Sequence, residues 1–586
     1  MIRFYLREES FRYCWGDTHH NPIQGEAKEE IHAVCPRGGF AAFQAVAASD
    51  RPMLVCIGRS GGFSPYGQVD RVRIAVRGDD WIAQHVRMQL VGLVQDDDGT
   101  WKSDLLLNQD AIYCDKRLQQ VWIELPVELE AEPGFHQGTV AFYYSRMFGQ
   151  ETLLKELRFS VNITGAKLPL PQNYKFYLDL WQHPCNIARK ADVPYYSDAH
   201  FAVLEEYVKS LAELGQKAVS VIVSDVPWSG QNCAATENAP TDLFEYSMIE
   251  TEKRDGAFFY DYSAMDRYIT LCETYGIREE IEVFGLTGIW TFSETGYGHP
   301  ATAYPEAIRI RYQENGVYGY LTQKEDVEAF IRALEVHFRE QGWLDRVRIA
   351  ADEPGDIEAY KRSLENLQAL APDFRIKAAT NRVAFIKEFA GVVQDFVPML
   401  SDLVQGKRVF DRLRQGIKGR TAFYVCCQPI RPNTYLSSPL LEARLLPVLA
   451  AWLGVDGFLR WSYTVWPEHP RTHLPYRSTL WKSGDTNFVY PGGNGSPLLS
   501  LRYKLLLRGI QDFELLQMDG LTPAQRQLYF EKLFFRSPGE FYGFDEHGFC
   551  DYIAPAEKLY SLQDEDYQKA SVMLQGWAAE NSCLAP

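Results

Sequence analysis

The chain has 586 residues, of which 46% are hydrophobic and 23% charged, so it is long enough for two to four domains with buried cores and is not expected to be disordered. Its 60 Lys and Arg against 77 Asp and Glu give a net charge of −17, which would repel a phosphate backbone. Nucleic acid and anionic membranes are therefore poor partners, and a neutral or cationic ligand fits better. No apolar run approaches the ~20 residues of a transmembrane helix, so no membrane insertion is expected.

The beginning of the chain, residues 1–9, lacks the apolar stretch and small-residue cleavage site of a signal peptide, which predicts a cytoplasmic protein. The 11 cysteines are odd in number and contain no CxxC pair, which favours reduced thiols over a disulfide framework. The sequence contains no Walker loop, and the zincin-like spacing of His469 and His473 lacks the accompanying Glu and includes Pro470, which opposes a helix. We therefore expect neither a metal nor a cofactor.

Residues 1–168 carry the pattern of an all-β domain. Val72, Ile74 and Val76 alternate with arginines, and similar apolar runs recur at 121–125, 140–144 and 157–161. Period-two alternation with turns between the runs predicts a β-sandwich. The sequence Leu-Pro-Leu-Pro at 168–171 then indicates a stiff linker, because proline fixes the backbone and removes a hydrogen-bond donor.

After the linker, short apolar segments alternate with amphipathic helical stretches. The predicted strands are 175–181, 218–223, 280–287, 347–353, 375–380, 395–399, 421–428 and 457–465. The predicted helices are 201–215, 266–276, 324–341, 356–370, 383–390, 402–418, 439–453 and 498–517. Eight strand and helix units predict a (β/α)8 TIM-like barrel over 172–515, followed by a helical C-terminal appendage over 516–586 that packs on the barrel. An open doubly wound sheet is less suitable, because its first strand would be followed by a glycine-rich turn rather than by residues 181–184, Trp-Gln-His-Pro.

The carboxyl ends of the predicted strands are rich in aromatic and amide side chains. In a barrel these ends meet at the active-site face. Indole and phenol rings can stack on the apolar face of a sugar, while amides and carboxylates bind its hydroxyls. The candidate substrate-binding residues are Trp461, Tyr463, Trp466, Asn381, Trp181, Trp228, Asp225 and Gln428. Core packing is the alternative role for each of them, and Tyr424, inside the seventh strand, could point either inward or outward.

The sharpest feature is the pair Asp352 and Glu353, two acids at the end of the apolar fourth strand. Helix capping and pairing with a barrel arginine are the alternatives. Burial and like charge can leave one acid of such a pair protonated and the other ionised, as glycoside hydrolysis requires. In ordinary glycosidases the two carboxyl groups flank the scissile bond at a distance of about 5 Å or more. Adjacent acids instead favour a mechanism in which the 2-acetamido oxygen of the substrate is the nucleophile, a recognised exception to the two-carboxylate rule.

The sequence resembles glycoside hydrolase family 123, the β-N-acetylgalactosaminidases, over about 175–515. The similar segments are 176–184, 352–354, 457–467, 484–492 and 508–514. The resemblance implies an N-terminal β-sandwich and a (β/α)8 catalytic domain. It also implies that Asp352 orients the acetamido group, that Glu353 is the general acid and base, and that the anomeric configuration is retained.

The expected partner is a glycan or glycoconjugate that contains β-linked N-acetylgalactosamine. Two alternatives remain at this point. One is a hexosaminidase of the same mechanism acting on N-acetylglucosamine, and the other is a non-catalytic glycan-binding barrel. The sequence does not indicate exo or endo action, the natural glycoconjugate or the oligomeric state.

Overall fold

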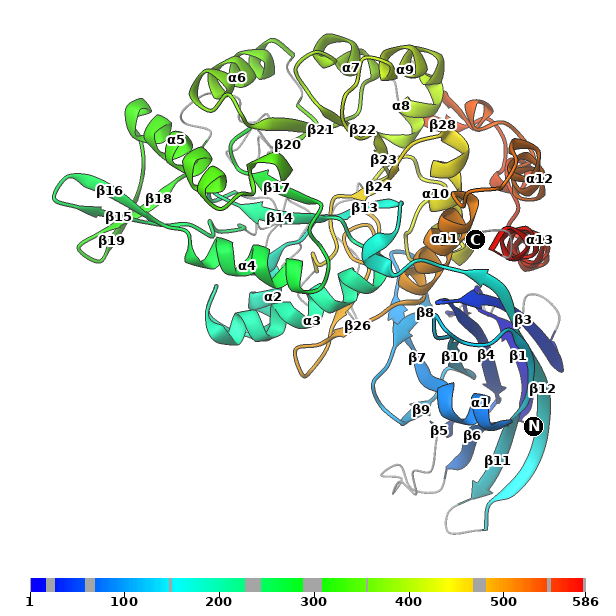
Figure 1. Ribbon diagram of the computed structural model, residues 1–586. Coiled ribbons are helices and arrows are strands. Elements are labelled where there is room, and N and C mark those ends of the chain that lie inside the picture. The colour runs from blue at the N-terminus through cyan, green and yellow to red at the C-terminus, as the bar shows by residue number, and fades with distance from the viewer. Residues whose placement is uncertain are drawn as a thin grey trace.

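The computed structural model describes residues 2–16, 27–57, 69–146, 150–226, 244–287, 308–354, 357–466, 481–544 and 550–582. Figure 1 shows two bodies side by side, an all-β body formed by the N-terminal residues and a larger α/β body. Among the described residues, no helix is long and apolar enough to cross a membrane. Trp228 and Trp290, which follow predicted strands, lie outside the described residues.

The N-terminal body consists of two six-stranded sheets packed face to face. One sheet has the order β1-β4-β10-β7-β8-β2, with bounds Arg3–Glu8, Phe40–Ala48, Leu118–Pro126, Arg87–Gln95, Trp101–Leu106 and Cys14–Trp15. The other has the order β3-β12-β11-β6-β5-β9, with bounds Glu30–Arg37, Thr152–Lys167, Gly134–Arg146, Asp70–Gly78, Met53–Ile57 and Ala111–Cys114. The alternation in β6 buries Val72 and Ile74 completely, and Phe43 and Phe159 meet across the core at 4.8 Å. A short helix, α1 (Asp80–His85), covers one end.

The α/β body contains eight parallel strands whose pairings run in a ring. Their order is β13-β14-β17-β20-β21-β22-β23-β24, with bounds Tyr177–Leu180, Ala218–Ile222, Glu280–Phe284, Val347–Asp352, Arg375–Thr380, Asp395–Pro398, Ala422–Tyr424 and Gly457–Arg460. A bridge between Leu178 and Gln216 joins β13 to the start of β14, and bridges at Phe396 and Met399 join β22 to β23. The pairing of β24 with β13 closes the ring. The region is therefore barrel-like, and each strand falls inside a range predicted from the sequence.

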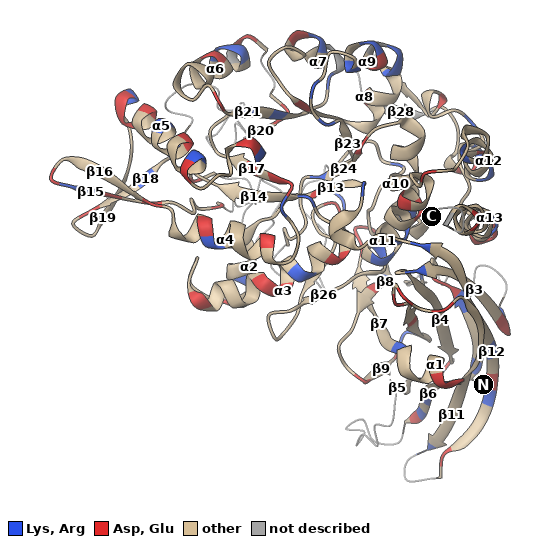
Figure 2. Ribbon diagram, viewed as in Figure 1, with Lys and Arg blue, Asp and Glu red and all other residues tan. Residues whose placement is uncertain are grey.

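Helices surround this ring. They are α2 (Pro184–Ala191), α3 (Asp198–Leu214), α4 (Ser263–Thr274), α5 (Lys324–Glu340), α6 (Ile357–Leu370), α7 (Val383–Phe389), α8 (Leu400–Gln405), α9 (Lys407–Arg414), α10 (Leu440–Leu453) and α11 (Leu501–Leu516). The helix predicted over 402–418 is divided into α8 and α9 at Gly406, a residue of low helix propensity. Figure 2 shows acidic and basic residues interspersed along the outer helices α5 and α6. The negative net charge is thus not concentrated on these two helices.

An excursion of two antiparallel hairpins interrupts the barrel-like region and was not predicted. The hairpins, β15 (Glu250–Arg254) with β16 (Ala257–Asp261) and β18 (Arg311–Glu314) with β19 (Val317–Tyr320), are joined through a parallel pairing of β15 with β18 in a four-stranded sheet of order β16-β15-β18-β19. The hairpins follow β14 and β17 in the chain. Figure 1 shows this sheet projecting away from the ring, beyond α4 and α5.

The C-terminal residues form α12 (Pro523–Leu533), the hairpin β27 (Tyr542–Phe544) and β28 (Cys550–Tyr552), and α13 (Asp564–Ser582). Helix α13 packs on β12 and β3 of the sandwich as well as on α11 and α12, so this segment bridges the two bodies instead of covering the barrel alone. A methyl group built at Gly165 would lie 3.2 Å from Cβ of Ala579. Glycine at this position allows β12 and α13 to approach closely.

Candidate active site

Asp352 and Glu353 lie at the carboxyl end of β20. Asp352 is the last residue of the strand and is 9% exposed. Glu353 has φ of 42°, in the left-handed region, and its N–H donates to the carbonyl of Ala379 at 3.0 Å. Side chains alternate between the two faces of a regular strand, so the positive φ breaks the alternation at the position of the second acid. This conformation costs about 1–2 kcal/mol for a non-glycine residue, and such strain is typical of functional sites.

Residues at the ends of two other strands of the ring, β21 and β23, hold the carboxyl group of Glu353. Asn381, directly after β21, donates from Nδ2 to Oε2 of Glu353 at 3.1 Å, and Tyr424, the last residue of β23, donates its hydroxyl to Oε1. Tyr424 therefore points toward the acid pair, which periodicity alone did not decide. Burial, together with the Glu353 charge, raises the pKa of the Tyr424 hydroxyl well above its ordinary value, so the hydroxyl remains a proton donor. The two contacts orient both carboxyl oxygens.

A third carboxyl group, which sequence reasoning missed, lies near Glu353. Asp402 is in the first turn of α8, directly after β22, and its Oδ2 atom is buried without a hydrogen-bond partner among the described residues. Burial, reinforced by the Glu353 charge, raises the pKa of Asp402 to about 7. The available sequence signal was an acid three residues after a predicted strand. It was assigned to a helix, and its contact with Glu353 depends on the closure of the ring.

Trp461 lies at the end of β24 beside a buried ion pair. Its Nε1–H donates to Oδ1 of Asp485 at 3.4 Å, and Arg460 donates to the same oxygen at 2.6 Å. Burial raises the pKa of Asp485 to about 6, although the Arg460 charge opposes this shift. The ring of His183 meets Trp461 edge-on at 6.4 Å, and burial lowers the pKa of this histidine to about 3, so it is neutral. Trp461 is 7% exposed and remains a binding candidate.

Tyr463 and Trp466 face helix α3, and their contact with a sugar stays a prediction. The Tyr463 hydroxyl shares a hydrogen bond with Ser210 of α3 at 2.7 Å, and the Trp466 ring packs beside Tyr207 of α3. Both side chains are 1% exposed. Both residues lie beyond β24, which ends at Arg460, although the N–H of Tyr463 still donates to the carbonyl of Trp181 at 3.1 Å.

The remaining candidates occupy different surroundings. Trp181 is 1% exposed and meets Phe284 edge-on at 5.0 Å, so it packs among the strand ends. Gln428 is half-buried, and its carbonyl accepts from the N–H of Cys426 at 2.9 Å. Its distance from the acid pair is not fixed by these contacts, and its binding role stays a prediction.

Asp225 anchors the four-stranded excursion. It follows β14, and its Oδ1 accepts from the N–H of Ser247 at 2.9 Å. Its Oδ2 accepts from the hydroxyl of Tyr320 at 3.0 Å and lies 3.5 Å from Nε of Arg311. Burial raises the pKa of Asp225, while these donors oppose the shift.

Among the residues that the structure describes, no group of three or more His, Cys, Asp or Glu side chains could hold a metal ion.

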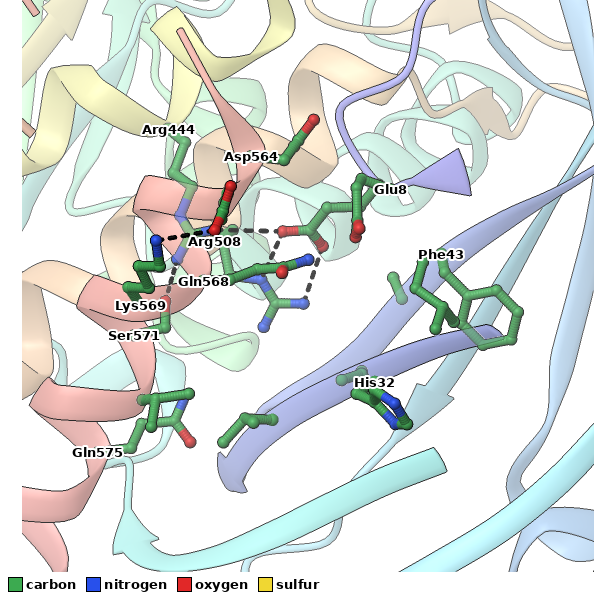
Figure 3. A pocket seen from close by; sticks show the side chains of 18 of the residues that line it. Glu8, His32, Phe43, Arg444, Arg508, Asp564, Gln568, Lys569, Ser571 and Gln575 are labelled. Carbon is green, nitrogen blue, oxygen red and sulfur yellow. Dashed lines mark hydrogen bonds and ion pairs between the residues drawn. The ribbon is translucent and has the colours of Figure 1, made fainter. Parts of the chain in front are cut away.

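A separate cavity of about 640 Å³ lies between the sandwich and the C-terminal helices (Figure 3). Its charged side chains pair with one another. Glu9 binds Arg508 at 3.0 Å and Arg444 at 3.5 Å. Asp564, whose pKa burial raises to about 6, accepts a hydrogen bond from Ser10. These pairs join elements of the two bodies, so we assign the cavity to the domain interface.

Comparisons with known proteins place this geometry in a family. Residues 181–519 match the catalytic domain of glycoside hydrolase family 123. A family 123 glycoside hydrolase from Clostridium perfringens, whose structure was analysed for glycolipid glycan hydrolysis, aligns over 100% of both chains with a TM-score of 0.75 and 18% identity. A β-D-glucuronidase from Dictyoglomus thermophilum aligns over 80% of this chain and 66% of its own, with a TM-score of 0.30 and 11% identity.

No curated protein matches the sequence. The family match contains Asp352 and Glu353 and covers more than half of the chain. The protein therefore belongs to glycoside hydrolase family 123.

Proposed function

We propose that the protein is a retaining glycoside hydrolase that removes β-linked N-acetylgalactosamine from glycans by substrate-assisted catalysis. The observation that carries the proposal is the adjacent pair Asp352 and Glu353, with Glu353 held by Asn381 and Tyr424. Membership of family 123 supplies the reaction class. The glycolipid glycans studied with the Clostridium perfringens enzyme are a candidate source of the substrate.

In the first step Glu353 transfers a proton to the glycosidic oxygen, and the bond from this oxygen to C1 breaks. The acetamido oxygen of the same sugar attacks C1 and forms an oxazolinium ring, because an intramolecular nucleophile has a high effective molarity. Asp352 accepts a hydrogen bond from the acetamido N–H and stabilises the developing positive charge. The aglycone leaves as an alcohol.

In the second step Glu353, now a carboxylate, removes a proton from a water molecule. The water oxygen attacks C1, the bond from C1 to the acetamido oxygen breaks, and the 2-acetamido group is restored. Two inversions at C1 retain the β configuration. Both steps require a carboxyl group that is held in position to give and take a proton. The hydrogen bonds from Asn381 and Tyr424 hold the carboxyl group of Glu353 in this way.

The test compares aryl 2-acetamido-2-deoxy-β-galactosides with the corresponding glucosides, in the presence and absence of an N-acetylgalactosamine thiazoline. We expect hydrolysis of the galactoside and competitive inhibition by the thiazoline. Preference for the glucoside would assign the enzyme to N-acetylglucosamine. Activity that the thiazoline leaves unchanged would contradict the oxazolinium mechanism, and no hydrolysis of either glycoside would favour a non-catalytic glycan-binding barrel.

Two substitutions separate the roles of the acids. We expect Glu353→Gln to lose most activity, because an amide can neither give nor take the proton. We expect Asp352→Asn to lose the assistance of the acetamido group. The value of kcat should therefore fall, with a smaller change in KM. A variant of either residue with the turnover of the wild-type enzyme would refute the assignment.

A further inference from the structure

The four-stranded excursion carries aromatic side chains that are exposed to solvent. Phe259 on β16 is 53% exposed, and Tyr318 on β19 is 64% exposed. The two rings belong to the opposite edge strands of the sheet. A group of exposed aromatic side chains on a projecting element indicates a surface that binds a ligand or another protein. Apolar residues that are scattered singly over a protein surface carry no such implication.

The strand register places these two rings on one face of the sheet. Phe259 is opposite Glu252, Glu252 is opposite Gln313, and Gln313 is opposite Tyr318. Residues directly opposite one another in neighbouring strands share a face, and three interstrand spacings amount to about 14 Å. The two rings therefore stand at the ends of one row, with a carboxylate and an amide between them.

The opposite face of the sheet is used for packing. Tyr260 meets Phe330 of α5 edge-on at 5.2 Å, and Phe258 meets Tyr312 edge-on at 5.3 Å. These residues alternate with Phe259 and Gln313 along their strands. Because the packing face is already covered, the row that contains Phe259 and Tyr318 is the outward face.

A cavity of about 190 Å³ lies on the outward face. Its lining includes Phe259 and Tyr318 together with Glu250, Glu252, Arg254 and Gln313. Arg254 forms a salt bridge with Glu252, which lies two residues earlier in β15. Aromatic side walls with amide, carboxylate and guanidinium groups between them match a sugar ring, which offers apolar faces to the walls and hydroxyl groups to the floor.

The cavity continues toward the barrel-like region. Arg311, which also lines it, lies with its guanidinium group 5.0 Å from the ring centroids of Tyr246 and Tyr318. Arg311 and its cross-strand neighbour Tyr320 both contact Asp225, the residue that follows barrel strand β14. The outward face is thus linked by direct contacts to the carboxyl-end face of the ring, where Glu353 lies.

We propose that this outward face, between Phe259 and Tyr318, is a second glycan-binding site that holds the part of a neutral oligosaccharide beyond the terminal N-acetylgalactosamine. The proposal rests on the proposed function, because it assigns the remainder of the same substrate to the excursion. The three carboxylates that line the cavity, on Glu250, Glu252 and Asp261, outnumber the guanidinium groups of Arg254 and Arg311 and disfavour an anionic sugar through like-charge repulsion. The site therefore selects neutral glycans over sialylated or sulfated ones.

Direct binding tests the site separately from hydrolysis. The probe is a neutral trisaccharide that corresponds to the aglycone of a β-N-acetylgalactosamine-terminated tetrasaccharide and lacks the terminal sugar. Titrations followed by saturation-transfer NMR would compare the wild-type protein with Phe259→Ala, Tyr318→Ala and the control Phe135→Ala, which removes a ring that is 60% exposed on the sandwich. We expect each of the first two substitutions to weaken binding by about two- to tenfold and the control to have no effect.

The kinetic readout is the ratio of kcat/KM for the tetrasaccharide to kcat/KM for an aryl monosaccharide. We expect this ratio to fall in Tyr318→Ala, and binding of a sialylated trisaccharide to be weaker than that of the neutral one. Absence of trisaccharide binding to the wild-type protein would overturn the proposal, and so would binding by both aromatic variants that is as strong as that of the wild-type protein. So would a dimer in light scattering that Tyr318→Ala dissociates, because the face would then join two copies of the chain. Trisaccharide binding without hydrolysis of the aryl substrate would refute the proposed function alone.

Discussion

The hydroxyl of Tyr424 offers a test of how Glu353 is controlled. Tyr424 is 3% exposed and donates to Oε1 of Glu353, while Asn381 donates to Oε2 at 3.1 Å. In Tyr424→Phe the ring still fills its place at the end of β23, and only the hydroxyl is removed. Glu353 then keeps the hydrogen bond from Asn381 and loses the one from Tyr424.

The expected effect follows from the charge on the acceptor. A hydrogen bond to a charged group contributes about 1.5–3 kcal/mol, and each 1.4 kcal/mol is a factor of about ten in rate. Because Asn381 still orients the carboxyl group, we expect kcat/KM to fall by about 10- to 100-fold. The loss should appear mainly in kcat, since Tyr424 acts through Glu353.

The assay uses two aryl β-N-acetylgalactosaminides, one with 2,4-dinitrophenol and one with phenol as the leaving group. Phenol leaves poorly and needs the proton from Glu353, so its hydrolysis should lose more than that of the dinitrophenyl glycoside. Tyr360→Phe is the matched control, because Tyr360 is 1% exposed and its hydroxyl has no hydrogen-bond partner in the part of the chain that the structure describes. Equal losses for both substrates, or a loss below threefold, would refute the role of Tyr424.

The remaining predictions concern buried charge. Asp402→Asn should raise the melting temperature relative to the wild-type protein increasingly between pH 4 and pH 8, because the pKa of Asp402 is raised to about 7 and the stability that its protonated form contributes is lost as the pH rises through that value. A constant difference over this range, measured by scanning fluorimetry, would contradict this. Lys377→Met should destabilise the fold by about 3–5 kcal/mol or prevent folding, because the single positive charge of Lys377 pairs with three buried acids, Asp179, Glu280 at 2.9 Å and Glu282 at 3.1 Å. Lys324→Met, at an exposed surface pair, should cost less than about 1 kcal/mol. Thermal unfolding of the Lys377→Met and Lys324→Met variants tests this prediction. Equal melting temperatures for these two variants would show that the barrel interior tolerates the uncompensated acids.

Much of the fold could be predicted because its signals are local. The strand at 347–353 and the helix at 324–341 are each defined by the spacing of a few apolar residues, and the structure places β20 and α5 within these ranges. The four-stranded excursion was not predicted because it lacks such a local signal. Its strands are four or five residues long and are rich in charged and aromatic residues on both faces, so no single window shows a clean period.

The candidate site divides in the same way. Asp352 and Glu353 could be identified because they are neighbours in the chain and end an apolar strand. The direction of Tyr463 could not, because it depends on the contact with Ser210 of α3, which is distant in the chain. Asp402 was hidden because its environment is set by burial and by the charge of Glu353, 49 positions earlier in the chain.

The sequence by itself determined the alternation of strands and helices, the acid pair and its adjacency, since each depends on residues within one element. The tertiary structure alone decided which side chains surround that pair. Tyr424, Asn381 and Asp402 reach Glu353 only because the ring of parallel strands brings the ends of β20, β21, β22 and β23 to one face. Contacts between distant segments depend on the register and closure of the whole ring, which no local pattern encodes.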